Sequence, residues 1–293
     1  MNALRFAVLG HPIAHSLSPA MHRAAFEQLG LPHTYEAIDV PDLAALAAWV
    51  ERLREGELAG ANVTLPYKVA VLDLVDAIDA SANAIGAANT LVRSEGRVVA
   101  HNTDIAGLAD DLREAGVEAE RAVVLGAGGA GLAAIAAARE LGVREIGVTS
   151  RSWTSTEAIA ASASATKVAR LGAQPLPFPG EEGPSVFADF AAEAGLLLQA
   201  TPAGTKGAAS GELVAAIVPW ERIDPSALAY DLVYNPAETP FLLRARRAGL
   251  RARGGLGMLA RQGARALASW LNVNPDVAAM QRAAERALCE VST

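Results

Sequence analysis

Residues 126–131 read Gly-Ala-Gly-Gly-Ala-Gly, between an apolar run at 121–125 and an alanine-rich run at 132–141. This order of strand, glycine loop and helix is the fingerprint of a dinucleotide site. Gly126 allows a tight turn, Gly128 lets backbone N–H groups approach a pyrophosphate, and Gly131 lets the helix pack close to the strand. The sequence therefore predicts a dinucleotide site, with a purely structural glycine turn as the alternative.

The residues after the next predicted strand, 145–149, select between dinucleotides. An NAD site usually carries Asp or Glu there, but this chain has Ser150, Arg151 and Ser152. A guanidinium suits the 2'-phosphate of NADP, and no carboxylate repels that phosphate. NADP is therefore predicted over NAD, the alternative being that Arg151 is an ordinary solvated arginine. Five further arginines between 244 and 253 are expected mainly on a solvated helix face, the alternative being contact with cofactor phosphates.

Two serines precede the first predicted helix, which begins at Pro19. Ser16 and Ser18 offer two hydroxyls beside free backbone N–H groups, an arrangement that could bind a carboxylate without an arginine. Alternatively, Ser18 is only a helix cap and Ser16 a loop hydroxyl. The residues alone leave both interpretations open.

A lysine follows the third predicted strand, at the start of a helix predicted over 66–78. In the first turn of a helix, Lys68 would face the positive end of the dipole, which is a poor place for a purely structural lysine. That environment favours general acid/base chemistry. A solvent-exposed lysine is the alternative.

Two further polar segments end predicted elements. Asn89 offers a donor and an acceptor to a hydroxylated ligand, and Asp104 could pair with Lys68 or with a substrate hydroxyl. The alternative is that both segments only form turns. No metal is expected, because the histidines lack a metal-binding pattern, and neither Ser16 nor Ser18 lies in the G-x-S-x-G elbow of a hydrolase.

Composition limits the class of protein. The chain has 293 residues, is 52% hydrophobic and carries a net charge of -7, which suits about two soluble domains and argues against nucleic acid as a partner. No apolar stretch approaches the length of a membrane helix, and residues 1–10 read as a strand, not a signal peptide. A cytoplasmic protein without disulfides is expected, with its one cysteine, Cys289, serving as a small apolar residue.

The order of elements predicts an α/β fold with two domains and parallel sheets. Apolar strand-like runs at 4–10, 33–40 and 58–64 alternate with helical runs at 19–29, 43–54 and 66–78. Further strands are predicted at 121–125, 145–149, 196–201 and 228–233, a surface loop at 174–185, and closing helices at 258–271 and 275–288.

Taken in order, these segments make the chain resemble the shikimate dehydrogenase family. The matching segments are 10–19, 60–68, 86–90, 102–104, 126–130, 200–204, 231–236 and 254–263. The resemblance implies NADPH-dependent reduction of 3-dehydroshikimate to shikimate, a step of aromatic amino acid biosynthesis through chorismate. It also implies an α/β substrate domain, 1–104 completed by 256–293, and a Rossmann-like doubly wound NADP-binding domain, 105–255, with the ligands in a cleft between them that closes on a hinge.

The resemblance also assigns roles to single residues. Lys68 and Asp104 match the catalytic pair, while Ser16 and Ser18 match the residues that bind the substrate carboxylate. The rest of the substrate pocket would be lined by Asn62, Thr64, Asn89, Tyr234 and Gln262. The cofactor would contact Gly126, Ala127, Gly128, Gly129, Ala130, Ser150, Arg151, Ser152, Thr201, Leu232 and Gly255.

Three positions depart from the family pattern, and all lie near the 2'-phosphate. Leu132 stands where an arginine is common, Ser155 where a further basic residue is common, and Ser150 where asparagine is usual. Arg151 is thus left alone to hold the phosphate.

Three other functions are alternatives to an NADP-dependent shikimate dehydrogenase. They are a quinate/shikimate dehydrogenase with relaxed cofactor use, a non-catalytic ligand-sensing homologue, and a Rossmann oxidoreductase with another substrate. For the oligomeric state, a monomer and a homodimer both remain open.

Overall fold

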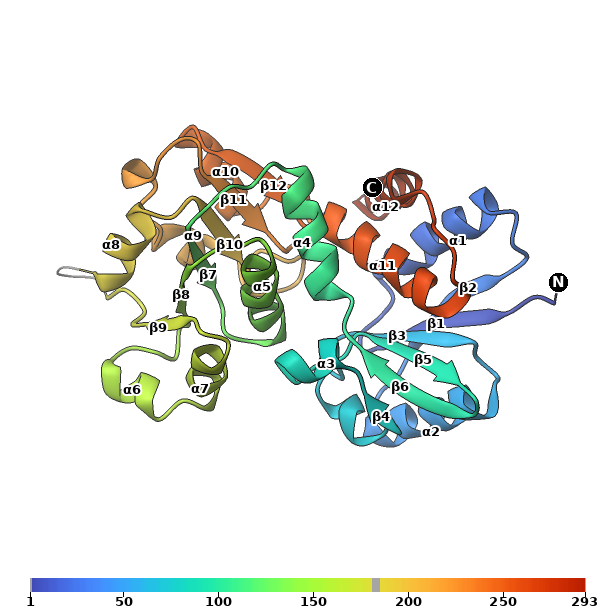
Figure 1. Ribbon diagram of the computed structural model, residues 1–293. Helices are drawn as coiled ribbons and strands as arrows, with labels where there is room; N and C mark the ends of the chain where they lie inside the picture. Colours follow the sequence, from blue (N-terminus) through green and yellow to red (C-terminus); the bar gives the residue numbers. More distant parts are fainter. Residues whose placement is uncertain (1, 181–184, 293) are drawn as a thin grey trace. The chain divides into compact units, whose positions relative to one another are not determined.

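The structure is a computed structural model that describes residues 2–180 and 185–292. Its internal contacts divide the chain into two compact units, Met1–Gly107 with Gly257–Thr293, and Leu108–Leu256 (Figure 1). Each unit is built on its own six-stranded sheet with helices packed against it. The α/β fold class predicted from the sequence is confirmed.

The first unit carries a mixed sheet with strand order β2-β1-β3-β5-β6-β4. Its strands are β1 (Arg5–Gly10), β2 (Thr34–Asp39), β3 (Gly60–Val63), β4 (Ala77–Ile78), β5 (Thr90–Ser94) and β6 (Arg97–His101). Its helices are α1 (Ser18–Gln28), α2 (Leu43–Glu55), the 3-10 turn η1 (Ala70–Asp73), α3 (Ala80–Ile85), α11 (Leu256–Leu271) and α12 (Val277–Ser292), while α4 (Asp104–Glu114) continues into the second unit.

The expectation of a purely parallel sheet in this unit is wrong. β5 runs antiparallel to both β3 and β6. The cause is a two-residue turn at Glu95 and Gly96, both with positive φ, because such a turn is far too short for the crossover that parallel strands need. This hairpin, which the sequence analysis did not find, joins the two segments that carry Asn89 and Asp104.

Alternation along β1 gives the first sheet a core on each face. Ala7 and Leu9 point into a cluster that includes Leu46 and Val50 of α2. Phe6 points the other way and stacks on Trp270 of α11, with ring centroids 5.0 Å apart. Helices from both ends of the chain therefore complete this unit.

The helix predicted over 66–78 does not form. Only η1 is helical, because the Lys68 carbonyl accepts its hydrogen bond from Ala88 N at 2.7 Å instead of from the following turn. Further along, Asp76 N donates to Val98 O, and β4 pairs with β6 as an edge strand. Tertiary hydrogen bonds thus outweigh the apolar periodicity that favoured a helix.

The second unit carries a fully parallel sheet with strand order β12-β11-β10-β7-β8-β9. Numbered within the unit, this is the 3-2-1-4-5-6 order of the doubly wound Rossmann fold, with the switch point between β7 and β10. Its strands are β7 (Arg121–Leu125), β8 (Glu145–Thr149), β9 (Gln174–Leu176), β10 (Leu196–Gln199), β11 (Leu228–Asp231) and β12 (Arg251–Gly254). Its helices are α5 (Gly129–Glu140), α6 (Thr156–Ala160), α7 (Ala163–Arg170), α8 (Val186–Ala192), α9 (Glu212–Ala216), η2 (Trp220–Arg222) and α10 (Pro240–Arg247).

One predicted loop of this unit proves to be partly strand. The first three residues of the 174–185 segment form β9, an edge strand in which Pro175 is tolerated, and residues 181–184 lie outside the described part of the chain. The arginines between 244 and 253 divide between the exposed end of α10 and the edge strand β12. No described helix has the length and apolar character needed to cross a membrane.

Candidate active site

A lysine and a carboxylate form a close pair in the first unit. Lys68 Nζ donates to Asp104 Oδ2 at 2.7 Å, with the two side chains 27% and 12% exposed. Asp104 is the first residue of α4, where a negative charge is favourable beside the helix N-terminus. Lys68, by contrast, precedes η1 and does not lie in the first turn of a helix, so the dipole argument made for it is wrong. What singles it out is its carboxylate partner in a partly buried position.

Asn89 holds that carboxylate from the other side. Its Nδ2 donates to Asp104 Oδ1 at 2.9 Å and to Gln262 Oε1 at 3.3 Å. Its Oδ1 accepts a hydrogen bond from Thr103 N at 2.7 Å. Since a backbone N–H can only donate, this bond fixes the amide orientation and directs the Nδ2 group toward Asp104. One carboxylate oxygen is thereby occupied by Asn89 and the other by Lys68.

The β5–β6 hairpin brings these groups together. Thr90 pairs with His101 in the strand register, so the residues just beyond them, Asn89 and Asn102, are neighbours. Asn102 Oδ1 accepts a hydrogen bond from Asp104 N at 3.0 Å, and its Nδ2 donates to Ala87 O at 2.9 Å. The turn-forming character of this segment, treated as an alternative to function, is therefore what orients the carboxylate.

The structure does not support the interpretation of Ser18 as a helix cap. Ser18 lies inside α1, and the N-cap position belongs to Leu17, which makes no side-chain cap. It is Ser16 whose Oγ accepts a hydrogen bond, at 3.3 Å, from Ser18 N. Ser18 is therefore not the predicted helix cap; it is buried, while Ser16 is half-buried.

The other first-unit residues assigned to the substrate lie around the same network. Asn62 at the end of β3 is buried and donates from Nδ2 to Asn89 O at 2.9 Å. Gln262 on α11 is buried and donates to Leu259 O at 2.9 Å, while its Oε1 accepts from Asn89. Thr64 follows β3 and is half-buried. The structure thus joins Asn62, Asn89, Gln262, Asp104 and Lys68 in one chain of hydrogen bonds.

The glycine loop of the second unit has the geometry that an anion site needs. Gly128 is the N-cap of α5 with no side chain to satisfy the first N–H groups, and a Cβ placed on it would meet open space. Gly126 has φ +112°, and a Cβ on Gly131 would lie 2.0 Å from Gly126 O. Ala127, Gly129 and Ala130 complete the loop and the first helical turn. A helix N-terminus open at the switch point of a Rossmann sheet fits a pyrophosphate.

The segment after β8 presents one cation. Arg151 is exposed and, among the described residues, makes no hydrogen bond or ion pair. Ser150 Oγ and Ser152 Oγ lie 3.4 Å apart on either side of it. A guanidinium without an internal partner is available to a ligand, as the prediction of a 2'-phosphate site requires.

The loops after β10 and β11 carry the remaining predicted residues. A Cβ on Gly126 would lie 2.9 Å from Thr201 Cγ2, which places Thr201 against the glycine loop. A Cβ on Gly255 would lie 2.3 Å from Leu232 O, so these two backbones also touch. Tyr234 follows in the loop after β11 and is half-buried. Close backbone contacts, rather than side-chain pairs, thus bring these residues together.

A buried carboxylate fixes these two loops. Asp231, fully buried at the end of β11, accepts hydrogen bonds from Val233 N at 2.9 Å and from Thr239 Oγ1 at 2.6 Å. Gln199 Nε2 donates to it at 3.3 Å, and Gln199 Oε1 accepts from Thr201 N at 2.6 Å. Burial raises the pKa of Asp231 to about 6, although its three hydrogen bonds oppose that rise.

Comparisons with known proteins follow the same division. The shikimate dehydrogenase substrate binding domain matches residues 8–91, and the shikimate 5'-dehydrogenase C-terminal domain matches residues 255–285. Shikimate dehydrogenase (NADP(+)) from Thermus thermophilus is 42% identical over 97% of this chain and 99% of its own length. The chain belongs to the shikimate dehydrogenase family.

Solved structures agree over nearly the whole chain. Shikimate 5-dehydrogenase from Thermus thermophilus, in complex with NADP(H) and shikimate, has a TM-score of 0.82 at 40% identity and covers 97% of this chain and 99% of its own. Shikimate 5-dehydrogenase from Listeria monocytogenes, in complex with shikimate and NAD, has a TM-score of 0.83 at 30% identity and covers 96% of both chains. The two-domain α/β fold expected of the family is confirmed.

The structure explains two of the departures from the family pattern near the 2'-phosphate. Leu132 is buried in α5, where its side chain packs into the interior of the unit. Ser155 is the N-cap of α6 and accepts a hydrogen bond from Ala158 N at 3.2 Å. Both positions serve the packing or capping of a helix, which leaves Arg151 as the cation of this segment.

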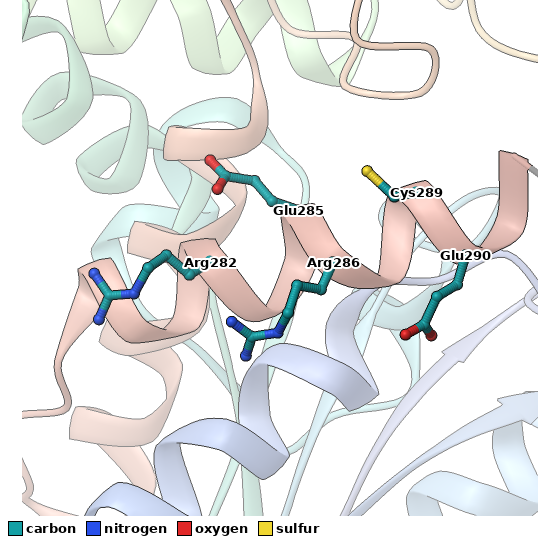
Figure 2. A pocket seen from close by; sticks show the side chains of 5 residues that line it. All are labelled: Arg282, Glu285, Arg286, Cys289 and Glu290. Carbon is teal, nitrogen blue, oxygen red and sulfur yellow. The ribbon is translucent and has the colours of Figure 1, made fainter.

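A hollow on α12 is lined by none of the predicted site residues. Figure 2 shows its lining, Arg282, Glu285, Arg286, Cys289 and Glu290. Charges of both signs alternate there, and Cys289 is exposed rather than packed as the expected small apolar residue. Among the described residues, no group of three His, Cys, Asp or Glu side chains could hold a metal ion. The hollow carries none of the chemistry of the family.

Sequence reasoning missed several residues that hold the predicted ones. Thr103 lies in the segment 102–104, for which a simple turn was the alternative, yet its backbone N–H orients Asn89. Asp231 and Gln199 were not singled out, although each ends a strand of the second unit, the place where α/β folds keep functional groups. That position was the available signal. Tyr35 and His22, both buried in the first unit, gave no such signal.

Proposed function

We propose that this protein is an NADP-dependent shikimate dehydrogenase that reversibly reduces 3-dehydroshikimate to shikimate, on the route to chorismate and the aromatic amino acids. The observation that carries the proposal is the Lys68–Asp104 pair, held in place by Asn89, in a chain that shares 42% identity with an NADP-dependent shikimate dehydrogenase. A buried network of this kind around one lysine suits a reaction that moves a single proton.

The substrate would lie over the polar network of the first unit. Ser16 and Ser18 are suited to its carboxylate, because they offer two hydroxyls at the N-terminus of α1. Asn62, Thr64, Asn89 and Gln262 would bind the ring hydroxyls, together with Tyr234 of the second unit. Amide and hydroxyl groups match a polyhydroxylated ring, because each offers both donors and acceptors.

The lysine and aspartate would divide the proton chemistry. As the ketone is reduced, negative charge develops on its oxygen, which the Lys68 ammonium can stabilise and protonate. Asp104 keeps Lys68 directed and balances its charge through the 2.7 Å hydrogen bond. In the oxidation direction, Lys68 would take the proton from the hydroxyl as the ketone forms.

The residues present in the second unit fit NADP. The open N-terminus of α5 suits the pyrophosphate, and the exposed Arg151 suits the 2'-phosphate. Gly126–Ala130, Ser150–Ser152, Thr201, Leu232 and Gly255 would hold the cofactor. When bound, the nicotinamide ring supplies or accepts the hydride. The protein contributes position, charge and exclusion of water.

The proposal is tested by following absorbance at the reduced-nicotinamide band while shikimate and quinate are each offered with NADP+ and NAD+. Reduction that is fastest with shikimate and NADP+ is the expected result. A comparable rate with quinate or NAD+ would place the protein among quinate/shikimate dehydrogenases with relaxed cofactor use. No turnover in any combination, with retained binding of shikimate, would leave a ligand-sensing homologue instead.

One observation favours the relaxed form as a second candidate. Arg151 alone is left for the 2'-phosphate, and the Listeria monocytogenes relative was solved with NAD. In this chain, however, the segment after β8 lacks the Asp or Glu that usually binds the ribose of NAD. NADP therefore remains the proposed cofactor.

The assignment of domains belongs to the same proposal. The first unit would be the substrate domain, residues 1–104 completed by 256–293, and the second would be the NADP-binding domain, residues 105–255. The contact-based boundaries, after residues 107 and 256, lie within three residues of these limits. A cytoplasmic enzyme, acting as a monomer or homodimer without nucleic acid, completes the proposal and suits a chain with one cysteine.

A further inference from the structure

A tyrosine with no assigned role lies beneath the substrate residues of the first unit. Tyr35 on β2 is 6% exposed, and its hydroxyl donates to Asn62 Oδ1 at 2.7 Å. The Ser18 side chain lies close enough to the same hydroxyl to oppose the rise in the pKa of Tyr35 that burial causes. The phenolic oxygen therefore contacts a residue of the proposed hydroxyl site and lies near a residue of the proposed carboxylate site.

A histidine supports the tyrosine ring. His22 of α1 is fully buried and stacks on Tyr35, with ring centroids 3.9 Å apart and planes 11° from parallel. Its Nδ1 lies 2.8 Å from Ser18 O. The edge of the His22 ring faces Gly263, where an added Cβ would lie 3.2 Å from His22 Cε1. The pair of rings thus reaches Ser18, Asn62 and the residue that follows Gln262.

The two rings stay uncharged over the ordinary pH range. Burial lowers the pKa of His22 to about 4 and raises the pKa of Tyr35 well above its ordinary value of 10.0. A neutral imidazole keeps one N–H, and the nearby carbonyl of Ser18 selects Nδ1 to carry it. The other ring nitrogen, His22 Nε2, is near the Gly263 backbone but has no hydrogen-bond partner among the described residues. A buried polar atom without a hydrogen-bond partner is unfavourable, and an apolar ring at this position would avoid that cost.

We propose that Tyr35 and His22 are positioning residues that set the spacing between the carboxylate site at Ser18 and the hydroxyl site at Asn62. This inference rests on the proposed function. Without the Tyr35 hydroxyl, Asn62 Oδ1 loses its donor, and the amide is held only at Nδ2, which donates to Asn89 O and Thr90 Oγ1. Without the His22 N–H, the Ser18 backbone loses a fixed partner at the first turn of α1.

The spacing matters because shikimate is a rigid ring with its carboxylate and hydroxyls at fixed positions. A rigid ligand binds best to groups that are already held in place, since no further entropy is lost on ordering them. Tyr35 and His22 would therefore act on substrate affinity and leave the proton step at Lys68 largely unchanged.

The first test is the variant Tyr35→Phe, which keeps the stacked ring and removes only the hydroxyl. We expect the KM for shikimate to rise about threefold to tenfold, the equivalent of one net hydrogen bond, while kcat and the KM for NADP+ stay near their wild-type values. The matched control is Tyr67→Phe. Tyr67 is also buried in the first unit, at 5%, but donates to the backbone oxygen of Val40 at 2.6 Å. The Tyr67→Phe variant should lose as much thermal stability as Tyr35→Phe, but its KM for shikimate should not change.

The second test is His22→Phe, assayed with shikimate and with its methyl ester. This variant keeps the stack but loses the hydrogen bond to Ser18, so we expect the preference for the free carboxylate to shrink by about threefold or more. The inference would be overturned if His22→Phe preferred shikimate over its methyl ester as strongly as the wild type does. An unchanged KM for shikimate in Tyr35→Phe would also overturn it. Failure of the wild-type enzyme to turn over shikimate would instead overturn the proposed function, and the two failures are thereby distinct.

Discussion

The two candidate sites are built in different ways. In the first unit, side chains are held by other side chains, as Asn89 holds Asp104 and Tyr35 holds Asn62. In the second unit, the glycine loop presents backbone N–H groups, and close backbone contacts bring Gly126 and Gly255 to their neighbours. The first site therefore depends on the orientation of amides and carboxylates. The second depends on the room that the glycines leave beside the backbone.

This difference suits the ligands proposed for each. A ring with several hydroxyls is recognised by groups whose donors and acceptors are fixed, because a turned amide would reverse the pattern. A pyrophosphate needs only converging N–H groups and positive charge. The first site should thus be sensitive to isosteric changes, and the second mainly to added bulk and to the loss of one arginine.

The largest effect is expected at Lys68, where the first site carries its chemistry. Lys68→Met removes the ammonium that stabilises and protonates the reacting oxygen, so kcat should fall by about 10²–10⁴-fold with little change in folding. Initial rates and thermal melts would measure this. Lys167→Met, an exposed lysine of α7, is the control and should leave both unchanged. A kcat within a few-fold of wild type would show that Lys68 is not the proton donor.

The next effect concerns Arg151, the charged side chain proposed to hold the 2'-phosphate of the cofactor. Arg151→Ala removes the charge-assisted hydrogen bonds to a 2'-phosphate, so kcat/KM for NADP+ should fall about tenfold to a hundredfold, while the value for NAD+ stays constant. Arg170→Ala, another exposed arginine of the second unit, is the control. Equal losses with both dinucleotides would argue that Arg151 does not read the phosphate.

Two glycines test the backbone character of the second site. Gly131→Ala would push a Cβ to 2.0 Å from Gly126 O, so the free energy of unfolding should fall by about 1–3 kcal/mol. Gly128→Ala meets no protein atom and should leave stability unchanged while raising the KM for NADP+. Melting temperatures and initial rates separate the two. If Gly128→Ala left the KM for NADP+ at its wild-type value, the pyrophosphate would not approach this residue.

The last effect is a pH dependence of stability, and it comes from Asp231, the buried carboxylate that fixes the loops of the second site. The pKa of Asp231 is raised in the folded protein to about 6 from an ordinary value of 3.8, so its contribution to stability is complete below the unfolded value and is lost as the pH rises through about 6. Relative to Asp231→Asn, the unfolding free energy of the wild type should fall by about 2 kcal/mol between pH values of about 4.5 and 7.5. Urea unfolding at several pH values would measure it. A constant difference would mean that Asp231 titrates near its ordinary pKa.

Local pattern was enough where one segment forms the whole feature. The glycine loop is such a case, because the strand, the turn and the open helix end are consecutive in the chain. The same reasoning failed over 66–78, where the apolar spacing favoured a helix but hydrogen bonds from Ala88 and Val98, both distant in sequence, gave a turn and an edge strand.

The candidate site shows the same limit. Lys68 was singled out for a helix dipole that is absent, although its partner Asp104 was identified among the possibilities. Tyr35 could not be found from its strand, because alternation predicts only that it is buried. The positioning role proposed for it depends on Asn62, which lies 27 residues away. Residue types indicate what a site could bind, while long-range contacts decide which atoms are held.

The β5–β6 hairpin has a consequence for how the site is assembled and how it can change. Its tight turn at Glu95 and Gly96 brings Asn89 beside Asn102 with few residues of intervening chain, so this half of the site closes a short loop at small entropic cost and can form early in folding. The turn also lies at the opposite end of the hairpin from those two asparagines. Extra residues inserted there would lengthen the tip without moving the Asp104 carboxylate, which makes it a suitable position for a fused tag or reporter.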